Sequence, residues 1–171
     1  MRVRRVKEPP YPKEIRTTVY GHAIPKARAR VVGTRRNQKT KAGEDIKPHS
    51  FTPKTTVEWE ASIYGQTLAD KPPYPYEGPI QLGVLFFRRM PKAIAGNKAK
   101  RARALAFELM PAGARDDYDN MIKAVKDALN GLYWLDDGQV VQYIPVDGMH
   151  PGKYYSDVPR VEILVRFLPQ G

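Results

Sequence analysis

The segment RDDYDN places three aspartates within four positions, at Asp116, Asp117 and Asp119. Carboxylates this close repel one another, so a bound cation would stabilise them together. Two more aspartates, Asp136 and Asp137, follow in the segment WLDDGQ. An oxygen-rich cluster of this kind suits Mg²⁺ or Mn²⁺ and does not suit zinc. The residue types therefore suggest a hard-cation site made by Asp117, Asp119 and either Asp136 or Asp137.

A helix is predicted directly after the first aspartates, over residues 119–130. Its apolar stripe keeps helical spacing and consists of Met121, Ile122, Val125, Ala128, Leu129 and Leu132. Asp117 or Asp119 can cap its start, and Gly131 is well placed just past its end. Lys123 and Asp127 follow Asp119 at one-turn intervals on one helix face. Since the chain returns after Gly131, we expect Asp136 or Asp137 to come back beside the start of this helix.

Each of these features also has a purely structural interpretation. Asp119 can be a helix cap, and Asp119, Lys123 and Asp127 can form a surface ladder of ion pairs. The Asp136-Asp137-Gly138 sequence is typical of a hairpin turn, here between strands predicted at 133–135 and 139–146. The coincidence of these features in one short segment of a strongly basic chain favours the functional interpretation.

The remaining patterns predict one α+β domain, with a mixed β-sheet of four or five strands and two main helices. Strands are expected at 15–24, at 80–87 in the centre of the sheet, and at 161–168, where the last strand closes the sheet. A second main helix is expected from Thr52 as N-cap and Pro53 to Leu68, with an apolar face. That face comprises Val57, Ala61, Tyr64 and Leu68. Residues 25–52 are expected to form a long basic loop, and residues 91–113 a basic linker with a short helix over 98–109.

The charge distribution favours nucleic acid as a partner. The chain has 29 Lys+Arg and 18 Asp+Glu, a net charge of +11. Residues 1–54 hold 15 of the bases and 4 of the acids, so the imbalance lies in the first third, and a second basic run spans 88–103. Basic segments around an acidic focus are typical of proteins that bind a polyanion. The candidate phosphate contacts are Lys26, Arg28, Arg30, Arg35, Arg36, Lys54, Lys98, Lys100 and Arg101.

Several classes of protein are excluded by the sequence. There is no cysteine, hence no disulfide framework and no cysteine-ligated zinc, which fits a cytoplasmic protein. The start lacks the apolar region of a signal peptide, and no stretch approaches the ~20 apolar residues of a membrane span. Residues 1–14 are expected to form a basic arm, and residues 15–171 the single folded domain.

Two segments resemble the hallmark of the RusA family of Holliday junction resolvases. Asp117–Leu129 fits D-x-D-N-x-x-K-x-x-x-D-A-L, and Trp134–Val140 fits W-x-D-D-x-Q-V. The stretches GHAIPKARAR at 21–30 and FTPKT at 51–55 resemble bacterial and phage members of the family. The similarity runs from about Ile15 to Leu168. The sequence departs from the family in the acid Asp116 and in longer segments at 31–50 and 91–114.

The resemblance implies a homodimeric, Mg²⁺-dependent endonuclease, with Mn²⁺ as a substitute, that cuts four-way DNA junctions symmetrically. It implies Asp117, Asp119 and Asp137 as metal ligands and Lys123 as the catalytic lysine, with Asp116 and Asp136 as accessory residues. A bacterial or phage origin follows from the habit of the family. The alternatives are a non-catalytic basic nucleic-acid-binding protein and a metal nuclease acting on other branched DNA, such as flaps or forks.

Overall fold

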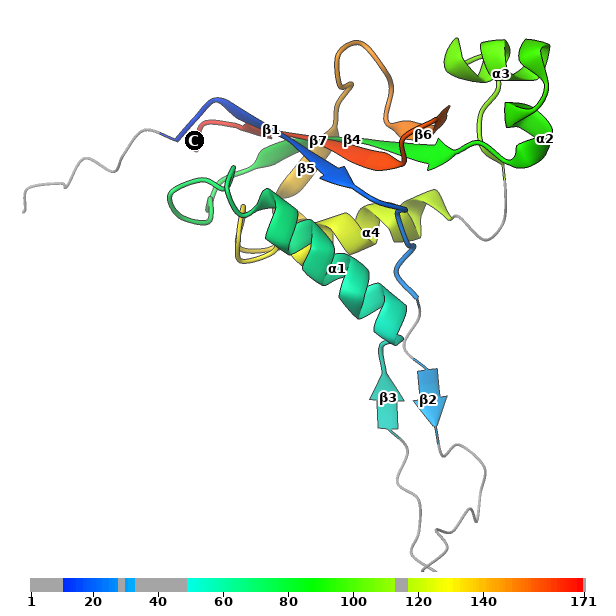
Figure 1. Cartoon of the computed structure of the whole chain (residues 1–171). Coiled ribbons are helices and arrows are strands. Elements are labelled where there is room, and N and C mark those ends of the chain that lie inside the picture. Colours follow the sequence, from blue (N-terminus) through cyan, green and yellow to red (C-terminus); the bar gives the residue numbers. More distant parts are fainter. Residues whose placement is uncertain (1–10, 28–29, 33–48, 113–116, 171) are drawn as a thin grey trace, which may run out of the picture.

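The computed structural model describes residues 11–27, 30–32, 49–112 and 117–170 (Figure 1). Most of the expected basic arm, residues 1–10, therefore lies outside the described residues, and the division of the chain at residue 15 stays a prediction. The described part of the chain contains no helix that is long and apolar enough to cross a membrane.

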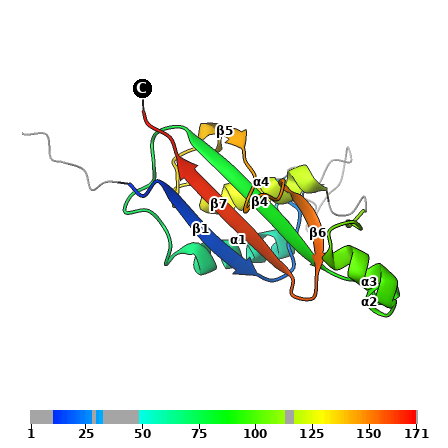
Figure 2. The ribbon, with the colours of Figure 1, turned by 90° about the horizontal axis from the view of Figure 1, so that it is seen from above.

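A mixed five-stranded sheet is built around β4 (Ile80–Arg89). On one side, β7 (Arg160–Phe167) pairs with β4 antiparallel, and β1 (Glu14–Tyr20) pairs antiparallel with β7. On the other side, β5 (Val140–Tyr143) and β6 (Gly152–Ser156) pair with successive parts of β4, both parallel to it. The predicted α+β class, the mixed sheet and the central position of the strand at 80–87 are confirmed (Figure 2).

Two main helices, α1 (Lys54–Thr67) and α4 (Tyr118–Leu129), cover one face of the sheet (Figure 1). The main core lies between them and the inward-facing residues of β4 and β7. A smaller buried cluster on the opposite face is formed by Leu85, Phe87, Ile144, Val146, Tyr154 and Leu164. Because β4 and β7 contribute to both clusters, they are buried on both faces, as expected of central strands.

The helix predicted over 119–130 is confirmed as α4. All six residues of its predicted stripe are buried, and they make up much of the main core. Asp117 is the N-cap, and Gly131 follows the helix with a φ of 74°. A positive φ is adopted by glycine without steric cost, so the chain turns sharply at this point and returns toward the sheet.

For α1, the sequence predicted the wrong face. Val57, Ala61, Tyr64 and Leu68 are exposed, whereas Thr56, Trp59, Ile63 and Thr67 are buried. Both sets keep helical spacing, and the face carrying Trp59 has the larger apolar area to bury. The helix begins one residue later than predicted, because Pro53 is the N-cap and makes no side-chain cap hydrogen bond.

Three predictions about strands are wrong. Residues 133–135 form turns around an isolated bridge at Trp134, and Asp136 caps a 3-10 turn, Asp137–Gln139, so there is no hairpin. The last strand, β7, does not close the sheet but lies inside it, between β1 and β4. The strand β6 was not predicted, since its GKYYS sequence offers little periodicity.

The basic segments contain more structure than predicted. Within residues 25–52, β2 (Arg30–Val32) and β3 (His49–Phe51) form a two-stranded antiparallel ribbon. The short helix predicted over 98–109 is α3 (Lys98–Leu105), and a further helical turn, α2 (Lys92–Ala95), precedes it. The β2–β3 ribbon and the α2–α3 pair both lie toward the end of the molecule where α4 begins (Figure 1).

Candidate active site

One small cavity brings together three of the predicted site residues. Asp119 and Lys123 from α4 and Asp137 from the 3-10 turn line a hollow of about 220 Å³. Ile122, Lys126 and Tyr143 complete its lining. The helix places Asp119 and Lys123 one turn apart on one face, and the returning chain adds Asp137, as the sequence predicted. Asp137, not Asp136, is thus the carboxylate that the return brings to the helix.

The start of α4 is held in place by Asp117 and Tyr118. The carboxylate of Asp117 accepts hydrogen bonds from Asp119 N at 3.0 Å and from Asn120 Nδ2 at 3.0 Å, and it does not line the cavity. The Tyr118 ring packs edge-on against Phe86, with ring centroids 5.7 Å apart. Burial raises the pKa of Tyr118, so its hydroxyl stays protonated and cannot act as a base at neutral pH. These contacts fix the first turn of α4, to which Asp119 belongs.

Gln139 organises the turn that carries Asp137. Its side-chain oxygen accepts hydrogen bonds from Leu135 N and Asp136 N, each at 2.8 Å. Its side-chain nitrogen donates to the carbonyl oxygens of Tyr76 at 2.8 Å and Gly78 at 2.7 Å. All four bonds involve backbone groups, so this one amide joins the 3-10 turn to the segment before β4. The motif position was noted in the sequence, but this role could not be read from it.

Asp136 and Trp134 serve the structure of the same turn. The Asp136 carboxylate accepts from Gly138 N at 2.7 Å, which directs it toward its own backbone. Trp134 is fully buried, its ring nitrogen donates to Asn130 Oδ1, and its carbonyl accepts from Gly131 N. The turn is therefore anchored to the end of α4, and Asp136 is a structural neighbour of the cavity.

Lys126 is a site residue that the sequence reasoning missed. Its Nζ lies 3.4 Å from Asp137 Oδ2, and its side chain is largely buried. The signal was present, because Lys126 follows Asp119 by seven residues and therefore shares its helix face. The surface ladder considered for this helix is absent, since Asp127 pairs with Lys26 and, among the described residues, Lys123 has no ion-pair partner.

The residues of the cavity fit a hard divalent cation. Among the described residues, no three carboxylate or histidine side chains lie close enough to form a complete metal site, and Asp116 lies outside the described residues. Mg²⁺ does not need such a site, because it keeps several waters and binds through one or two carboxylates together with substrate phosphates. Asp119 and Asp137 provide these two carboxylates, and Asp117 lies two residues from Asp119.

Three of the predicted phosphate-binding residues have carboxylate partners within the protein. Lys26 Nζ lies 2.5 Å from Glu60 and 3.0 Å from Asp127, Lys54 pairs with Glu58, and Arg101 lies 2.5 Å from Asp157. For Lys26, desolvation lowers the pKa, but the hydrogen bonds to Glu60 and Asp127 outweigh it and leave the pKa raised. Lys26 is therefore a charged link between α1 and α4.

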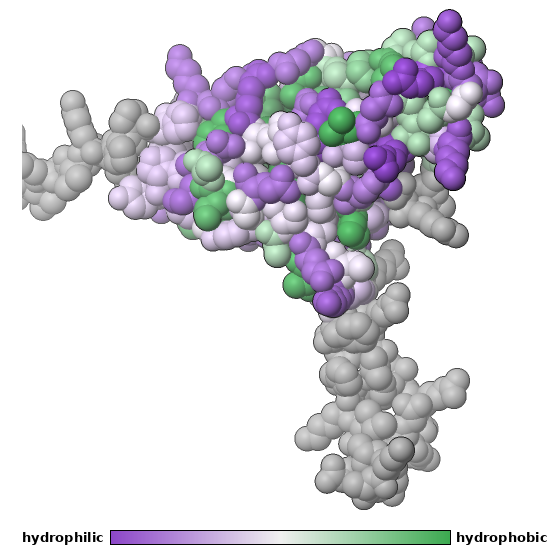
Figure 3. Space-filling model, in the orientation of Figure 1, coloured by the Kyte–Doolittle hydropathy of each residue, from purple (hydrophilic) through white to green (hydrophobic). Residues whose placement is uncertain are grey.

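Of the other candidate phosphate contacts, some lie within the described residues and some lie outside them. Lys98 and Lys100 of α3 are exposed and, within the described part of the chain, have no ion-pair partner. Figure 3 shows hydrophilic side chains projecting at the α2–α3 end of the molecule. Arg28, Arg35 and Arg36 lie outside the described residues, and only the backbone of Arg30 is described, in β2. Of the candidate phosphate contacts whose side chains the structure describes, Lys98 and Lys100 are thus the exposed ones without a carboxylate partner.

Two comparisons relate the chain to known proteins. The family model described as "Endodeoxyribonuclease RusA" matches residues 28–166, which include both acidic segments. A relative from Bacillus subtilis (strain 168), named "Uncharacterized protein YqaN", is 36% identical over 152 residues. That alignment covers 89% of this chain and 95% of the relative, so the two proteins are similar along almost their entire lengths.

Proposed function

Because the chain belongs to the RusA family of endodeoxyribonucleases, we propose that it resolves four-way DNA junctions by metal-dependent, symmetric hydrolysis of phosphodiester bonds. The observation that carries the proposal is the convergence of Asp119, Lys123 and Asp137 on one cavity. The helix α4 contributes the Asp119 carboxylate and the Lys123 ammonium, and the turn 18 positions after Asp119 contributes the Asp137 carboxylate to the same small volume. Helix capping and turn formation alone do not require this convergence.

In the proposed site, Asp119 and Asp137 hold Mg²⁺, and Asp117 supports them from the helix cap. A divalent ion held by these carboxylates would supply Lewis acidity toward a phosphate oxygen and would make a water molecule more acidic. The Lys123 ammonium faces the same cavity and stabilises the negative charge that develops on the phosphate in the transition state. Lys126 keeps the Asp137 carboxylate directed into the cavity when DNA is absent.

The DNA arms are held through their phosphates, a contact that is independent of sequence. Lys98 and Lys100 belong to α3, which lies at the end of the molecule where α4 begins (Figure 1). The phosphate contacts of Arg28, Arg30, Arg35 and Arg36 stay predictions from the sequence. A four-way junction has two symmetry-related scissile bonds. A two-fold homodimer with one cavity per protomer matches that symmetry. In each protomer, residues 15–171 form the proposed nuclease domain.

A cleavage assay on synthetic DNA tests this proposal. Purified protein is incubated with a four-way junction, a flap, a fork and linear duplex of matched length, with Mg²⁺ and with EDTA. We expect paired, symmetric nicks in the junction with Mg²⁺ or Mn²⁺, none in EDTA, and slower cutting of the other substrates. Junction binding without cleavage in any divalent metal would identify a binding protein, and preferred cutting of flaps or forks would change the assigned substrate.

A further inference from the structure

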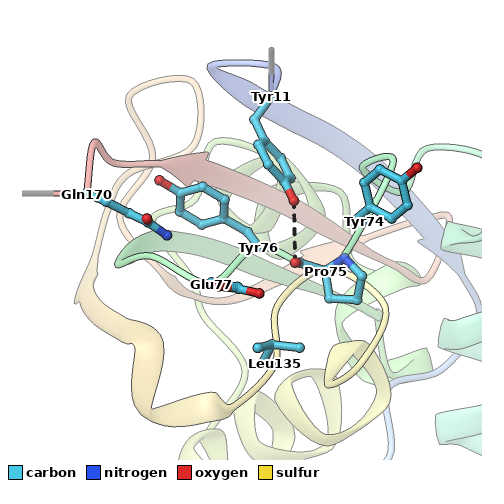
Figure 4. A pocket seen from close by; sticks show the side chains of 7 residues that line it. All are labelled: Tyr11, Tyr74, Pro75, Tyr76, Glu77, Leu135 and Gln170. Atoms are coloured by element: carbon cyan, nitrogen blue, oxygen red, sulfur yellow. Dashed lines mark hydrogen bonds between the residues drawn. The ribbon is translucent and has the colours of Figure 1, made fainter. Parts of the chain in front are cut away.

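A second and larger cavity is lined in part by Leu135, which lies two residues before Asp137. Its volume is about 590 Å³, and it is lined by Tyr11, Tyr74, Pro75, Tyr76, Glu77, Leu135 and Gln170 (Figure 4). Three of these side chains are tyrosines, and they come from the start of the described chain and from the segment before β4. None of these residues belongs to the cavity of Asp119 and Asp137.

One part of this aromatic cavity consists of packed rings, and another part consists of side chains exposed to solvent. The rings of Tyr11 and Tyr76 meet edge to face with centroids 4.9 Å apart, and Tyr76 packs in the same way on Phe167. The Tyr76 hydroxyl donates to the carbonyl oxygen of Leu168. By contrast, Tyr74 is 63% exposed and Leu135 is 56% exposed. Large apolar side chains are left in water at the mouth of a preformed hollow, which is typical of a binding site.

The aromatic cavity is fixed relative to the nuclease site. Leu135, which lines it, precedes Asp137 by two residues, so their backbones are at most about 7 Å apart. Gln139 binds the backbone of Leu135 with one end of its amide and the carbonyls of Tyr76 and Gly78 with the other. The aromatic cavity and the nuclease site are therefore joined through one short, hydrogen-bonded turn.

The cavity also contains an acid that no base neutralises. Within the described part of the chain, the Glu77 carboxylate has neither an ion-pair nor a hydrogen-bond partner. A carboxylate is a pure acceptor, and in DNA recognition it accepts from exocyclic amino groups of bases. Aromatic side chains stack on base faces, a contact that every base can make. The tyrosine rings can stack on the face of a flat heterocycle, and the Glu77 carboxylate can accept a hydrogen bond from an amino group on its edge.

We infer that the aromatic cavity receives an unstacked nucleobase with an exocyclic amino group, from a nucleotide on the same side of the junction as the cleaved phosphate. The inference rests on the proposed function, which places DNA at Asp119 and Asp137. Branch points suit such a site, because an unpaired base costs little to extrude. A basic peptide would also match tyrosine faces and Glu77, but the fixed link through Gln139 to the Asp137 turn favours a part of the DNA.

The inference is tested by a scan of abasic junctions in EDTA, with dissociation constants from fluorescence anisotropy. Each nucleotide around the scissile phosphate in turn lacks its base. For wild-type protein we expect one position where loss of the base weakens binding about 5- to 150-fold. The Leu135→Ala and Tyr74→Ala variants should bind the intact junction more weakly by a similar factor. Their dissociation constants should not depend on whether the base at that position is present. Val158→Ala, equally exposed in the β6–β7 turn, is the matched control.

The Glu77→Gln variant tests the proposed hydrogen bond between the Glu77 carboxylate and the exocyclic amino group of the base. Wild-type protein should bind adenine, cytosine or guanine at that position more tightly than thymine, and the variant should lose this preference. Uniform binding of all abasic junctions, or a base effect that persists in Leu135→Ala and Tyr74→Ala, would overturn the inference while leaving junction cleavage in Mg²⁺ intact. An arginine-bearing peptide tests the alternative ligand. The inference would be overturned in favour of a peptide if this peptide binds wild-type protein but not Glu77→Gln, and if it leaves the effect of the base on junction binding unchanged. Absence of any junction binding or cleavage would refute the proposed function itself.

Discussion

Lys126 Nζ lies 3.4 Å from Asp137 Oδ2, inside the cavity that Asp119 and Lys123 also line. The lysine is largely buried, whereas Asp137 remains open to solvent at 38% exposure, so the ammonium covers only part of the carboxylate. A metal ion that approaches Asp137 therefore meets a competing positive charge from the protein. The pair holds the carboxylate in place and also limits its affinity for a cation.

Replacing Lys126 by methionine should raise the affinity for Mg²⁺ about 1.5- to 5-fold, because an ion pair whose carboxylate stays open to solvent contributes only ~0.2–1 kcal/mol. The concentration of Mg²⁺ at half-maximal cleavage and calorimetric titration of the DNA-free protein measure this change. Lys126→Arg keeps the charge and serves as the control. A lower affinity in the methionine variant would mean that Lys126 orients Asp137 more than it competes with the ion.

Asp119→Asn and Asp137→Asn should each lose at least about 100-fold in cleavage rate while still binding junctions, because each removes a proposed metal ligand. Binding is expected to be equal or tighter, since a negative charge facing phosphate is lost. Asp70→Asn, an exposed aspartate after α1, is the control. Single-turnover cleavage and anisotropy give the two quantities, and wild-type cleavage by either variant would contradict the proposed site.

Lys123→Ala should slow cleavage about 10²- to 10³-fold and change junction affinity much less, since its charge meets negative charge that develops only in the transition state. Lys123 is exposed and, among the described residues, unpaired, so the variant should keep the wild-type melting temperature. Single-turnover rates at saturating protein provide the measurement. A folded variant within threefold of the wild-type rate would remove Lys123 from the mechanism.

Gln139→Met removes four side-chain hydrogen bonds, two accepted from Leu135 N and Asp136 N within the turn and two donated to the carbonyl oxygens of Tyr76 and Gly78. At ~0.5–1.5 kcal/mol for each bond, the variant should unfold at a clearly lower denaturant concentration and should bind Mg²⁺ more weakly. Gln139→Glu keeps the acceptor for Leu135 N and Asp136 N and loses the two donors. Its second carboxylate oxygen would repel the carbonyl oxygens of Tyr76 and Gly78, so we expect it to be at least as unstable as Gln139→Met. Equal metal affinity in all three proteins would show that Asp137 needs no such support.

Lys26→Met should destabilise the protein by about 1–3 kcal/mol, because Glu60 and Asp127 lose their shared cation at the junction of α1 and α4. The pKa of Lys26 is raised above its ordinary value of 10.5, so its contribution is complete below pH 10.5 and is lost as the pH rises through the folded-state pKa. Denaturation curves of wild type and variant should differ at pH 8 and converge in strongly alkaline buffer. Equal stabilities at pH 8 would free Lys26 for a role in DNA binding.

The sequence by itself determined the features that depend on local spacing. The stripe from Met121 to Leu132 predicted α4 and its buried face, and the four-residue interval placed Lys123 beside Asp119. Gly131 marked the turn after the helix. In each case the helical repeat of 3.6 residues fixes the relative positions of the side chains before any other segment is in place.

Only the tertiary structure decided the features that depend on distant segments. Two stripes of α1 have equal helical spacing, and packing against the sheet selected the one with Trp59 and Ile63. Residue spacing left Asp136 and Asp137 as alternatives, although the family resemblance implied Asp137. The bonds of Gln139 to Tyr76 and Gly78, about 60 residues earlier in the chain, hold the turn that brings Asp137 to the cavity. Such contacts join groups whose separation is not set by any local repeat. They form only when burial of the core holds distant parts of the chain together, and the sequence spacing carries no record of them.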